Sequence, residues 1–491
     1  MSGRRFCWRL TVGVAFALIG CRNDSTTTPG AGGTGAATTG GTTPASGTGA
    51  VATTGGDGAG GSPAAGALPE TGGGGAGGSP IVAPMLRGAP FPFSPTASSF
   101  GLNAVVVQGD PTTLVARTRE LGSSEWSALA PPSVPAANVA EWTLGGLSPS
   151  TLYEYEILAG EGGESLFVGS TRTQRLEGES FSFALLADSH IGQDLTYSNQ
   201  GDPEVLRAVS RDILAIDPDF MVNLGDMLDF HQFGFNEPPR TTWQAYLNYR
   251  ELLGPTLGQV PHFGVIGNWE GENGDFAADD IEWSQRQRLV YLPNPDPGTY
   301  PEGGAETEDY YAFTWGDALF IVLNVMTYTP TSHLLQYDPG LPDDWTLGED
   351  QFAWFQRTLE NATSKWRFVL IHHAVGGAGP GGIDAAYGRG GGQAAYVGEQ
   401  ALVHQLMREH GAQIFFYGHD HVFTDMVVDD IHYTLPGSAG AIWMFTAEET
   451  GYNPEQTWAE PGFGRVDVGP DAVDVQFIGL GGELLYSYRI E

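Results

Sequence analysis

From Gln174 to the end of the chain, short apolar runs with strand character alternate with segments that place apolar residues three and four positions apart. The first pattern is typical of buried strands and the second of helices that pack one face on a sheet. The alternation predicts a layered α/β domain, in which helices cover a sheet. We expect strands at 181–187, 220–224, 262–266, 318–324, 368–371 and 413–417, helices at 204–216, 349–360 and 399–409, and a strand-like ending at 464–490 that closes a sheet edge.

Ahead of this domain, residues 85–175 contain short runs with strand character that are separated by Gly, Pro and Ser clusters, which is typical of a small β-sandwich. The segment 144–155 reads Leu-Gly-Gly-Leu-Ser-Pro-Ser-Thr-Leu-Tyr-Glu-Tyr and resembles the late strand and tyrosine corner of fibronectin type III domains. Its aromatic residues are expected in the core. The expected strands are 102–107, 113–118, 139–144, 152–158 and 166–173.

The amino-terminal segment is typical of an export signal. Arg4, Arg5 and Arg9 precede an apolar run, 10–19, that is too short to span a membrane. The run ends Leu-Ile-Gly-Cys at Cys21, which resembles the bacterial lipobox and implies a lipid on that cysteine. A plain secretory signal is the alternative. We expect a lipoprotein signal peptide at 1–21 and an exported, membrane-anchored lipoprotein, periplasmic or at the cell surface, that contacts the membrane only through Cys21.

Residues 22–84 consist of Gly, Ala, Thr and Ser with almost no large apolar side chain, so they cannot bury enough surface to fold. We interpret them as a disordered tether. The whole chain carries 22 basic against 58 acidic residues, a net charge of −36, which argues against a nucleic-acid partner. A small anionic substrate would need a local positive centre to overcome this field, and bound metal ions would provide one. The only cysteines are Cys7 and Cys21, which leaves the folded part without thiolate ligands.

Polar clusters follow several of the predicted strands of the α/β domain. Since loops at the carboxyl ends of strands in an open sheet can converge on one point, these clusters are candidates for a shared site. Their histidines, carboxylates and amide suit a metal centre. The clusters are Asp188-Ser189-His190, Gly225-Asp226, Gly267-Asn268-Trp269-Glu270, His372-His373 and Gly418-His419-Asp420-His421.

The order and residue types of these clusters resemble the calcineurin-like metallophosphoesterase family. The resemblance implies that residues 176–491 form a catalytic domain with the family's four-layer α/β/β/α sandwich of two mixed sheets. It implies that Asp188, His190 and His421 hold one metal ion, that Asn268, His372 and His419 hold another, and that Asp226 bridges the two. It also implies catalytic roles for Asp188, Asp226, His372 and the residue at position 269, Trp269.

The family's chemistry is hydrolysis of phosphate esters, either monoesters or diesters. Two ions about 3.5 to 4 Å apart can clamp the attacking and leaving oxygens of an in-line displacement, and the pKa of a metal-bound water can fall from about 15.7 to about 7. The nucleophile is then a metal-bound hydroxide. Imidazole, carboxylate and amide ligands suit Fe, Mn or Zn, as two divalent or trivalent ions. The expected partner is therefore a small phosphate ester.

The β-sandwich ahead of the catalytic domain resembles the architecture of purple acid phosphatases, which would make the enzyme acid phosphatase-like. Two residues depart from that group. Purple acid phosphatases have a glycine where this chain has His190, and an iron-binding tyrosine where this chain has Asp229. Without a tyrosinate ligand, no purple colour is expected.

A further departure concerns catalysis, since the family's usual Gly-Asn-His-Glu or Gly-Asn-His-Asp is here Gly-Asn-Trp-Glu, with Trp269 in place of the histidine. Tryptophan offers an N–H donor but no titratable proton, so it cannot replace a general acid. Either the enzyme favours good leaving groups, or His231, His373 or Asp229, or less favourably Glu270, supplies the proton. The alternative function is a metal-binding surface lipoprotein that has lost catalysis and retains a binding role.

Overall fold

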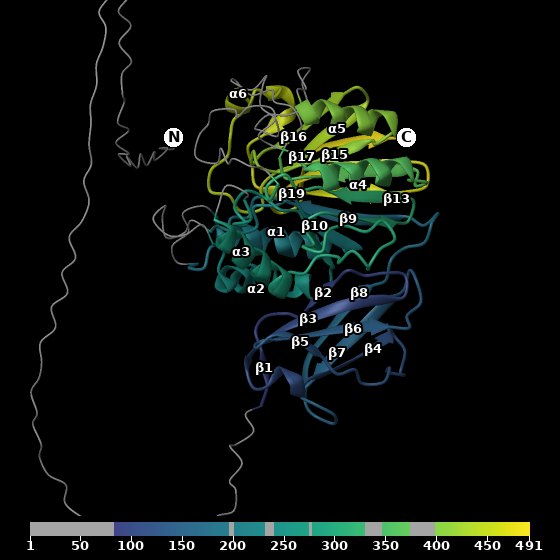
Figure 1. Cartoon of the computed structure of the whole chain (residues 1–491), viewed down its shortest axis with the longest axis vertical. Coiled ribbons are helices and arrows are strands. Elements are labelled where there is room, and N and C mark those ends of the chain that lie inside the picture. The colour runs from purple at the N-terminus through teal and green to yellow at the C-terminus, as the bar shows by residue number, and fades with distance from the viewer. Residues whose placement is uncertain (1–82, 196–200, 231–239, 274–276, 329–345, 374–397) are drawn as a thin grey trace, which may run out of the picture. The chain divides into compact units, whose positions relative to one another are not determined.

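The structure is a computed structural model that describes residues 83–195, 201–230, 240–273, 277–328, 346–373 and 398–491. The predicted signal peptide and nearly all of the predicted tether lie outside the described residues. Two antiparallel sheets come first along the described chain, and an α/β part with two larger sheets follows (Figure 1). Among the helices of the described segments, none has the length and apolar character needed to cross a membrane.

The first part, from Met85 to Arg172, is a β-sandwich. One sheet has the order β1-β3-β6-β5, with β2 also paired to β3, and the other has the order β4-β7-β8. Leu102 and Trp142 of the first sheet and Tyr155 of the second belong to one buried core. The elements are β1 (Met85–Leu86), β2 (Phe91–Phe93), β3 (Ser99–Gln108), η1 (Pro111–Thr113), β4 (Val115–Glu120), β5 (Ser133–Ala136), β6 (Val139–Gly145), β7 (Leu152–Leu158) and β8 (Ser165–Arg172).

The tyrosine expected at a sandwich corner is Tyr153. Its side chain is buried, and its hydroxyl accepts a hydrogen bond from the backbone N–H of Ser148 at 2.9 Å. A tyrosine corner makes this type of bond to the backbone a few residues upstream. The geometry suits the fibronectin type III resemblance, which stays a prediction.

The α/β part contains two mixed sheets. The first has the order β11-β10-β9-β19-β20-β21 and the second the order β12-β13-β14-β15-β17-β16-β18. The strands of the first are β9 (Phe181–Leu186), β10 (Phe220–Asn223), β11 (His262–Gly264), β19 (Gly462–Val468), β20 (Val473–Gly479) and β21 (Glu483–Ile490). Those of the second are β12 (Tyr311–Trp315), β13 (Ala318–Val322), β14 (Trp366–Leu370), β15 (Ile414–Phe416), β16 (Phe423–Val428), β17 (Ile431–Pro436) and β18 (Thr457–Trp458).

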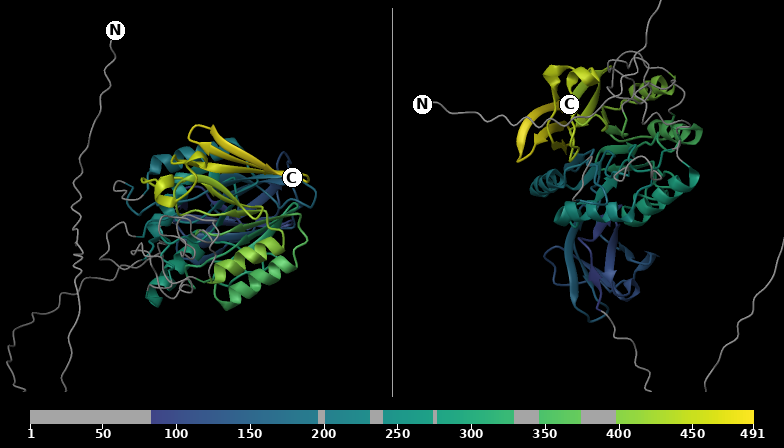
Figure 2. Two further views of the ribbon diagram at one scale, coloured as in Figure 1. Left: turned by 90° about the horizontal axis from the view of Figure 1, so that it is seen from above. Right: turned by 90° about the vertical axis from the view of Figure 1, so that its left-hand side faces the viewer.

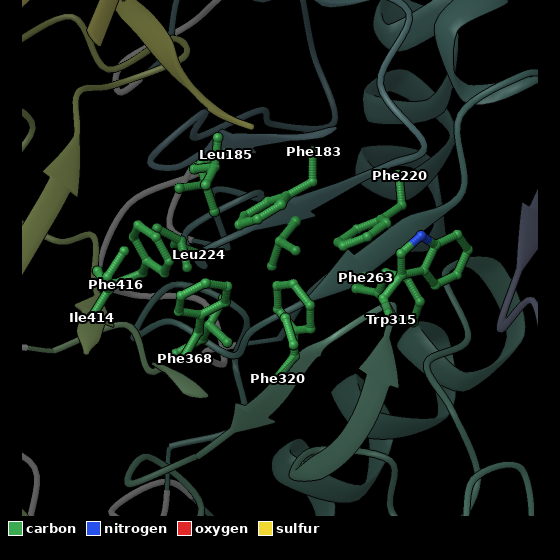
Figure 3. Close-up of a cluster of buried hydrophobic side chains, with 14 of the residues drawn as sticks. Phe183, Leu185, Phe220, Leu224, Phe263, Trp315, Phe320, Phe368, Ile414 and Phe416 are labelled. Carbon is green, nitrogen blue, oxygen red and sulfur yellow. The ribbon is translucent and has the colours of Figure 1, made fainter. Parts of the chain in front are cut away.

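The inner faces of the two sheets meet in a core of aromatic side chains (Figure 3). Phe183 of β9 stacks on Phe220 of β10 at 5.2 Å between ring centroids, and meets Phe320 of β13 edge-on at 5.1 Å. Such offset and edge-to-face pairs add stabilisation of about 0.5 to 1.5 kcal/mol each to the burial of the rings. Since strand residues alternate between faces, Ala184 and Leu186 belong to a different core on the other side of the sheet.

Helices cover the outer face of each sheet. Leu206 and Val209 of α1 pack in the same core as Ala184 of β9, while Phe355 of α4 packs with Val369 of β14. The order of layers is therefore helices, sheet, sheet, helices (Figure 1). This confirms the predicted four-layer α/β/β/α fold with two mixed sheets. The helices are α1 (Pro203–Ala215), α2 (Trp243–Leu257), α3 (Ala278–Tyr291), α4 (Glu349–Glu360), α5 (Gly398–Glu409) and α6 (Ala447–Thr450), with the short turn η3 (Pro454–Gln456).

Strand direction brings the loops of both sheets to one end of the domain. Strands β9, β10 and β11 run parallel in the first sheet, and β13, β14 and β15 run parallel in the second. The carboxyl ends of parallel strands lie at the same edge of a sheet, so the polar clusters that follow them can meet. The chain ends in β20 and β21, which form one edge of the first sheet, as expected from the 464–490 pattern (Figure 2).

The β-sandwich contacts α2 directly. The buried Arg250 guanidinium donates to Oδ1 and to the backbone carbonyl of Asn103 at 2.7 and 3.0 Å. Arg87 also donates to Asn248 Oδ1 at 3.2 Å, and the amide nitrogen of Asn248 donates to the carbonyls of Gly192 and Gln193 at 2.9 and 3.0 Å. Hydrogen bonds therefore connect the β-sandwich to α2, and α2 to the loop after His190.

Candidate metal centre

The predicted metal ligands all follow strands at one end of the two-sheet core. Asp188 and His190 follow β9, Asp226 follows β10 and Asn268 follows β11 in the first sheet. The second sheet contributes His372 after β14, and His419 and His421 after β15.

Asp188, His190, Asp226 and His421 form a compact buried group. Each offers a ligand atom within 4.8 Å of those of the others. The Nε2 atom of His190 lies 3.7 Å from Asp226 Oδ2 and 3.2 Å from Nε2 of His421, which in turn lies 3.5 Å from Asp188 Oδ1. The group contains the residues predicted for one metal ion together with the predicted bridge.

A second group, His372, His373 and His419, has its ligand atoms within the same limit of 4.8 Å. His372 and His419 are predicted ligands of the other ion. His373 is an addition, since the sequence suggested it only as a proton donor. Asp226 links the groups, because its Oδ2 atom lies 3.1 Å from Nε2 of His372 as well as 3.7 Å from Nε2 of His190. A bridging carboxylate would occupy such a position.

Asn268 is 3% exposed, and its Oδ1 atom has no hydrogen-bond partner among the described residues. A buried amide oxygen left in this state costs free energy unless something else binds it. Asn268 lies in the loop that follows β11, as the other predicted ligands lie in loops that follow their strands, and this position suits a metal ligand. The donor set as a whole, with imidazole, carboxylate and amide oxygen, fits the metals expected from the sequence.

The backbone orients two of the histidines. Nδ1 of His372 lies 2.7 Å from the carbonyl oxygen of Leu224, and Nδ1 of His421 lies 2.9 Å from that of Trp443. A carbonyl oxygen only accepts, so Nδ1 is the protonated nitrogen of each ring. Nε2 is then the nitrogen that faces the carboxylates, which is how a metal-binding histidine is usually held.

Many of the predicted ligands have a backbone conformation that L-residues rarely adopt. Positive φ angles in non-glycine residues cost of order 1 to 3 kcal/mol each and gather at functional sites. The surrounding bonds must therefore maintain these conformations. The φ angles are 55° at Asp188, 49° at His190, 52° at Asp226, 77° at His419 and 55° at His421.

Two glycines permit the close approach of the loops. A Cβ atom on Gly267 would lie 2.3 Å from both the backbone nitrogen and Oδ1 of Asp226, and one on Gly225 would lie 2.6 Å from Nδ1 of His372. Gly225 also has a φ of 99°. A side chain at either position would displace a predicted ligand.

Glu270, which ends the Gly-Asn-Trp-Glu cluster, holds the loop of Asp226. Its fully buried carboxylate accepts backbone N–H groups from Gly267 at 2.6 Å, Met227 at 2.7 Å and Asp226 at 3.1 Å. The carboxylate joins the loops after β10 and β11. These bonds favour a positioning role for Glu270 over the suggested role of proton donor.

Buried negative charge dominates the centre. Burial and, after it, the charge of Asp226 raise the pKa of Glu270 to about 8. Burial likewise raises the pKa of Asp188 well above its usual value. Burial alone would lower the pKa of His372, but the neighbouring carboxylate of Asp226 outweighs it and raises that pKa to about 9. Bound cations would relieve the carboxylates, so the electrostatics suit a metal centre.

Trp269, at the family's histidine position, lies against this centre. Its backbone N–H donates to Asp226 Oδ1 at 2.8 Å. Its ring lies edge-on to that of His190, at 5.4 Å between centroids, and 5.4 Å from the ring of Phe230. Of the suggested substitutes for the missing acid, His373 lies in the second histidine group, Asp229 is buried in the loop after β10, and His231 falls outside the described residues.

The sequence interpretation missed the segment after β17. Ser438 donates from its hydroxyl to the carbonyl of Asp188 at 2.9 Å, and the N–H of Ala441 donates to the same oxygen at 2.9 Å. Trp443 then accepts from His421 through its carbonyl. The sequence feature that could have indicated this segment is the run of small residues 437–441, which directly follows a predominantly apolar strand.

A cavity of about 510 Å³ opens elsewhere, at the amino end of β9. Two of the arginines that line it, Arg172 and Arg175, are paired with the buried Asp219 at 3.0 and 2.8 Å. None of the predicted ligands lines this cavity. It is therefore separate from the metal centre.

Comparisons with known proteins agree with the fold. Residues 181–423 match the family model of the calcineurin-like phosphoesterases. A solved structure of PhoD, 15% identical, aligns with a TM-score of 0.62 over 82% of this chain and 90% of that chain. GAP50, the anchor in the inner membrane complex of Plasmodium, is 14% identical and aligns over 64% of this chain and 89% of that chain with a TM-score of 0.41. No curated protein sequence matches.

Because the PhoD structure is only 15% identical, its similarity supports the fold and nothing more. The GAP50 structure, with a TM-score of 0.41, is too different to support any conclusion. The family model covers β9 to the start of β16, which includes every predicted ligand. With its two-sheet fold and the converging Asp and His side chains, the chain belongs to the calcineurin-like metallophosphoesterase superfamily.

Proposed function

We propose that this protein hydrolyses small phosphate esters, monoesters or diesters, at a centre of two metal ions. The calcineurin-like phosphoesterase domain by itself indicates a metal-dependent hydrolase that acts on phosphoesters. The observation that supports a dinuclear centre is the position of Asp226 between the two groups of predicted ligands. Its Oδ2 atom lies 3.7 Å from Nε2 of His190 in one group and 3.1 Å from Nε2 of His372 in the other. Fe, Mn and Zn all suit these ligands.

The protein's own groups prepare the centre for this chemistry. When bound, two ions supply electrostatic stabilisation of the phosphoryl group and activate water for in-line attack. Asp226 is held in place by the backbone N–H of Trp269 on its Oδ1 atom and by Glu270 on its backbone nitrogen. Preorganised ligands need no rearrangement during the reaction, which lowers the barrier.

Metal removal tests this function. We expect the metal-loaded protein to hydrolyse p-nitrophenyl phosphate, bis(p-nitrophenyl) phosphate or both, and the metal-stripped protein to fall to the uncatalysed rate, with activity restored by Zn, Mn or Fe. The ratio of the two rates would rank monoester against diester. A protein that binds two metal ions and hydrolyses neither ester would instead support the alternative, a metal-binding protein that has lost catalysis.

Trp269 is expected to limit the range of leaving groups. An alkoxide needs a proton more than an aryloxide does, and a general acid typically contributes about 10² to 10⁴-fold. Trp269→His should therefore raise kcat on an alkyl phosphate by about 10-fold or more, with a smaller change on p-nitrophenyl phosphate. Steady-state kinetics on both esters measure the difference, and Trp269→Phe, which adds no acid, is the control. An equal rise on both esters would contradict this role.

We also propose that hydrolysis takes place outside the cytoplasm, on a protein tethered by a lipid on Cys21. The support is the amino-terminal sequence, with its arginines, its short apolar run and the Leu-Ile-Gly-Cys ending. These residues lie outside the described part of the chain. The acid phosphatase-like specificity suggested by the preceding β-sandwich belongs to the same proposal.

A further inference from the structure

Aromatic rings border one half of the metal centre. The ring of Trp443 lies 5.0 Å from that of His190 and 4.7 Å from that of His421, between centroids. The ring of Trp269 lies 5.4 Å from that of His190, and the ring of Phe445 lies 5.5 Å from that of His421. We refer to Phe230, Trp269, Trp443 and Phe445 as the aromatic row.

The two tryptophans of this row are accessible although the ligands beside them are not. His190 is 1% and His421 is 2% exposed, whereas Trp269 and Trp443 are both partly exposed. Each tryptophan therefore keeps some accessible surface, and its ring lies next to a buried histidine of the metal centre. Burying that surface against an apolar group is favourable. The net charge of −36 repels an anion but does not oppose the binding of an uncharged apolar group.

Hydrogen bonds hold the backbone that carries Trp443. The segment that leads to it is fixed to Asp188 by the Ser438 hydroxyl and the Ala441 N–H, each 2.9 Å from the Asp188 carbonyl oxygen. At Trp443 itself the backbone carbonyl accepts from His421 at 2.9 Å. Of these three bonds only the one from His421 involves a Trp443 atom, its backbone carbonyl, and none involves the ring. A ligand that stacks on a preordered ring loses little free energy to ordering of the protein.

We propose that Trp443, together with Trp269, binds a planar aromatic group of the substrate while the phosphate lies at the metal centre. The substrate class is then phosphate esters that carry an aryl group or a nucleobase. Aromatic pairs gain affinity from ring geometry in addition to buried area, which distinguishes a planar ring from an aliphatic group of similar size. The inference rests on the proposed function and makes Trp443 a specificity-determining residue.

Phosphonates test this inference apart from leaving-group chemistry, because they carry the organic group on a carbon that the enzyme does not release. We would measure the Kd values of phenyl-, cyclohexyl- and methylphosphonate by calorimetry on the metal-loaded full chain. Phenylphosphonate should bind about 10-fold more tightly than methylphosphonate and more tightly than cyclohexylphosphonate. In Trp443→Leu the phenyl-to-methyl ratio should fall to about 2 or below, while Trp443→Phe should keep most of it.

Trp126→Leu is the matched control. This partly exposed tryptophan lies in the β-sandwich, where the guanidinium groups of Arg117 and Arg119 stack on its ring at 4.6 and 4.2 Å. The ratio should not change in this variant. Metal content is measured for every variant, and the comparison of phenyl with cyclohexyl in the unaltered protein tests the inference even if Trp443→Leu fails to fold.

The possible failures are distinguishable. Equal Kd values for phenyl- and cyclohexylphosphonate, in a protein that hydrolyses phosphate esters, would overturn the aromatic subsite and leave the proposed function intact. A parallel loss of affinity for all phosphonates in Trp443→Leu would also overturn it, because Trp443 would then act only by supporting His421. Absence of both hydrolysis and phosphonate binding would overturn the proposed function itself.

Discussion

Asp226→Asn should lower kcat on p-nitrophenyl phosphate by about 10³-fold or more, since a two-metal centre supplies several kcal/mol of transition-state stabilisation and each 1.36 kcal/mol is a factor of ten. Asp226 is the carboxylate that approaches both histidine groups. Asparagine keeps the shape of the side chain but removes the negative charge that holds two cations together. The loss should therefore appear in metal occupancy as well as in rate.

The measurement combines steady-state kinetics with metal analysis of the same samples. Asp471→Asn is the control. Asp471 is exposed in the turn between β19 and β20, so this substitution makes the same chemical change away from the metal centre. The control should retain full activity. An Asp226→Asn protein that binds two metal ions and keeps kcat within about 10-fold of the unaltered protein would show that Asp226 does not bridge them.

Glu270→Ala should destabilise the protein by several kcal/mol, about 3 to 6. The change leaves the backbone N–H groups of Gly267, Met227 and Asp226 without their carboxylate acceptor in a fully buried position. A buried donor that loses its acceptor costs about 1 to 3 kcal/mol. Because these groups belong to the loops after β10 and β11, metal affinity should also fall, by about 10 to 100-fold.

Urea unfolding with and without metal measures both effects. Glu270→Gln is the conservative control, since its side-chain carbonyl still accepts some of these N–H groups and should limit the loss to less than that of alanine. If Glu270→Ala unfolds at the same urea concentration as the unaltered protein, the carboxylate does not hold the loops together.

The same residue gives the metal-free protein a pH dependence. The pKa of Glu270 is about 8 in the folded protein and near 4.5 when its environment is removed. The folded state therefore retains a proton that the unfolded chain loses, and this contribution to stability is complete below pH 4.5 and lost as the pH rises to about 8. Glu270→Gln should flatten the unfolding free energy of metal-free protein over this interval.

Much of the fold could be predicted because its strands are buried on both faces. Residues 183–187 and 318–323 are continuous apolar runs that contain most of β9 and all of β13, and both faces of these strands are covered. Helix α2, in contrast, was missed. It is buried around most of its circumference and changes direction at Gly254, which has a φ of 50°, just before Pro255, so it presents no apolar stripe.

The sequence by itself determined the residue types, their order, and their places after apolar strands. From these, a layered α/β domain and the convergence of Asp188, Asp226, His372 and His419 at one end follow, because parallel strands bring their carboxyl ends to the same edge. The arrangement in two sheets was implied by the family resemblance. The family membership was expected on this basis and is confirmed. The ligand roles of the individual residues stay predictions.

Only the tertiary structure decided which side chains gather in each of the two groups of predicted ligands, and which neighbouring residues hold those ligands in place. It placed His373 beside His372, turned Glu270 to the backbone of another loop, and set the ring of Trp443 against His190. These contacts join segments that are far apart in the chain. They depend on how the two sheets pack and how each loop leaves its strand, and no spacing within a single segment encodes such geometry.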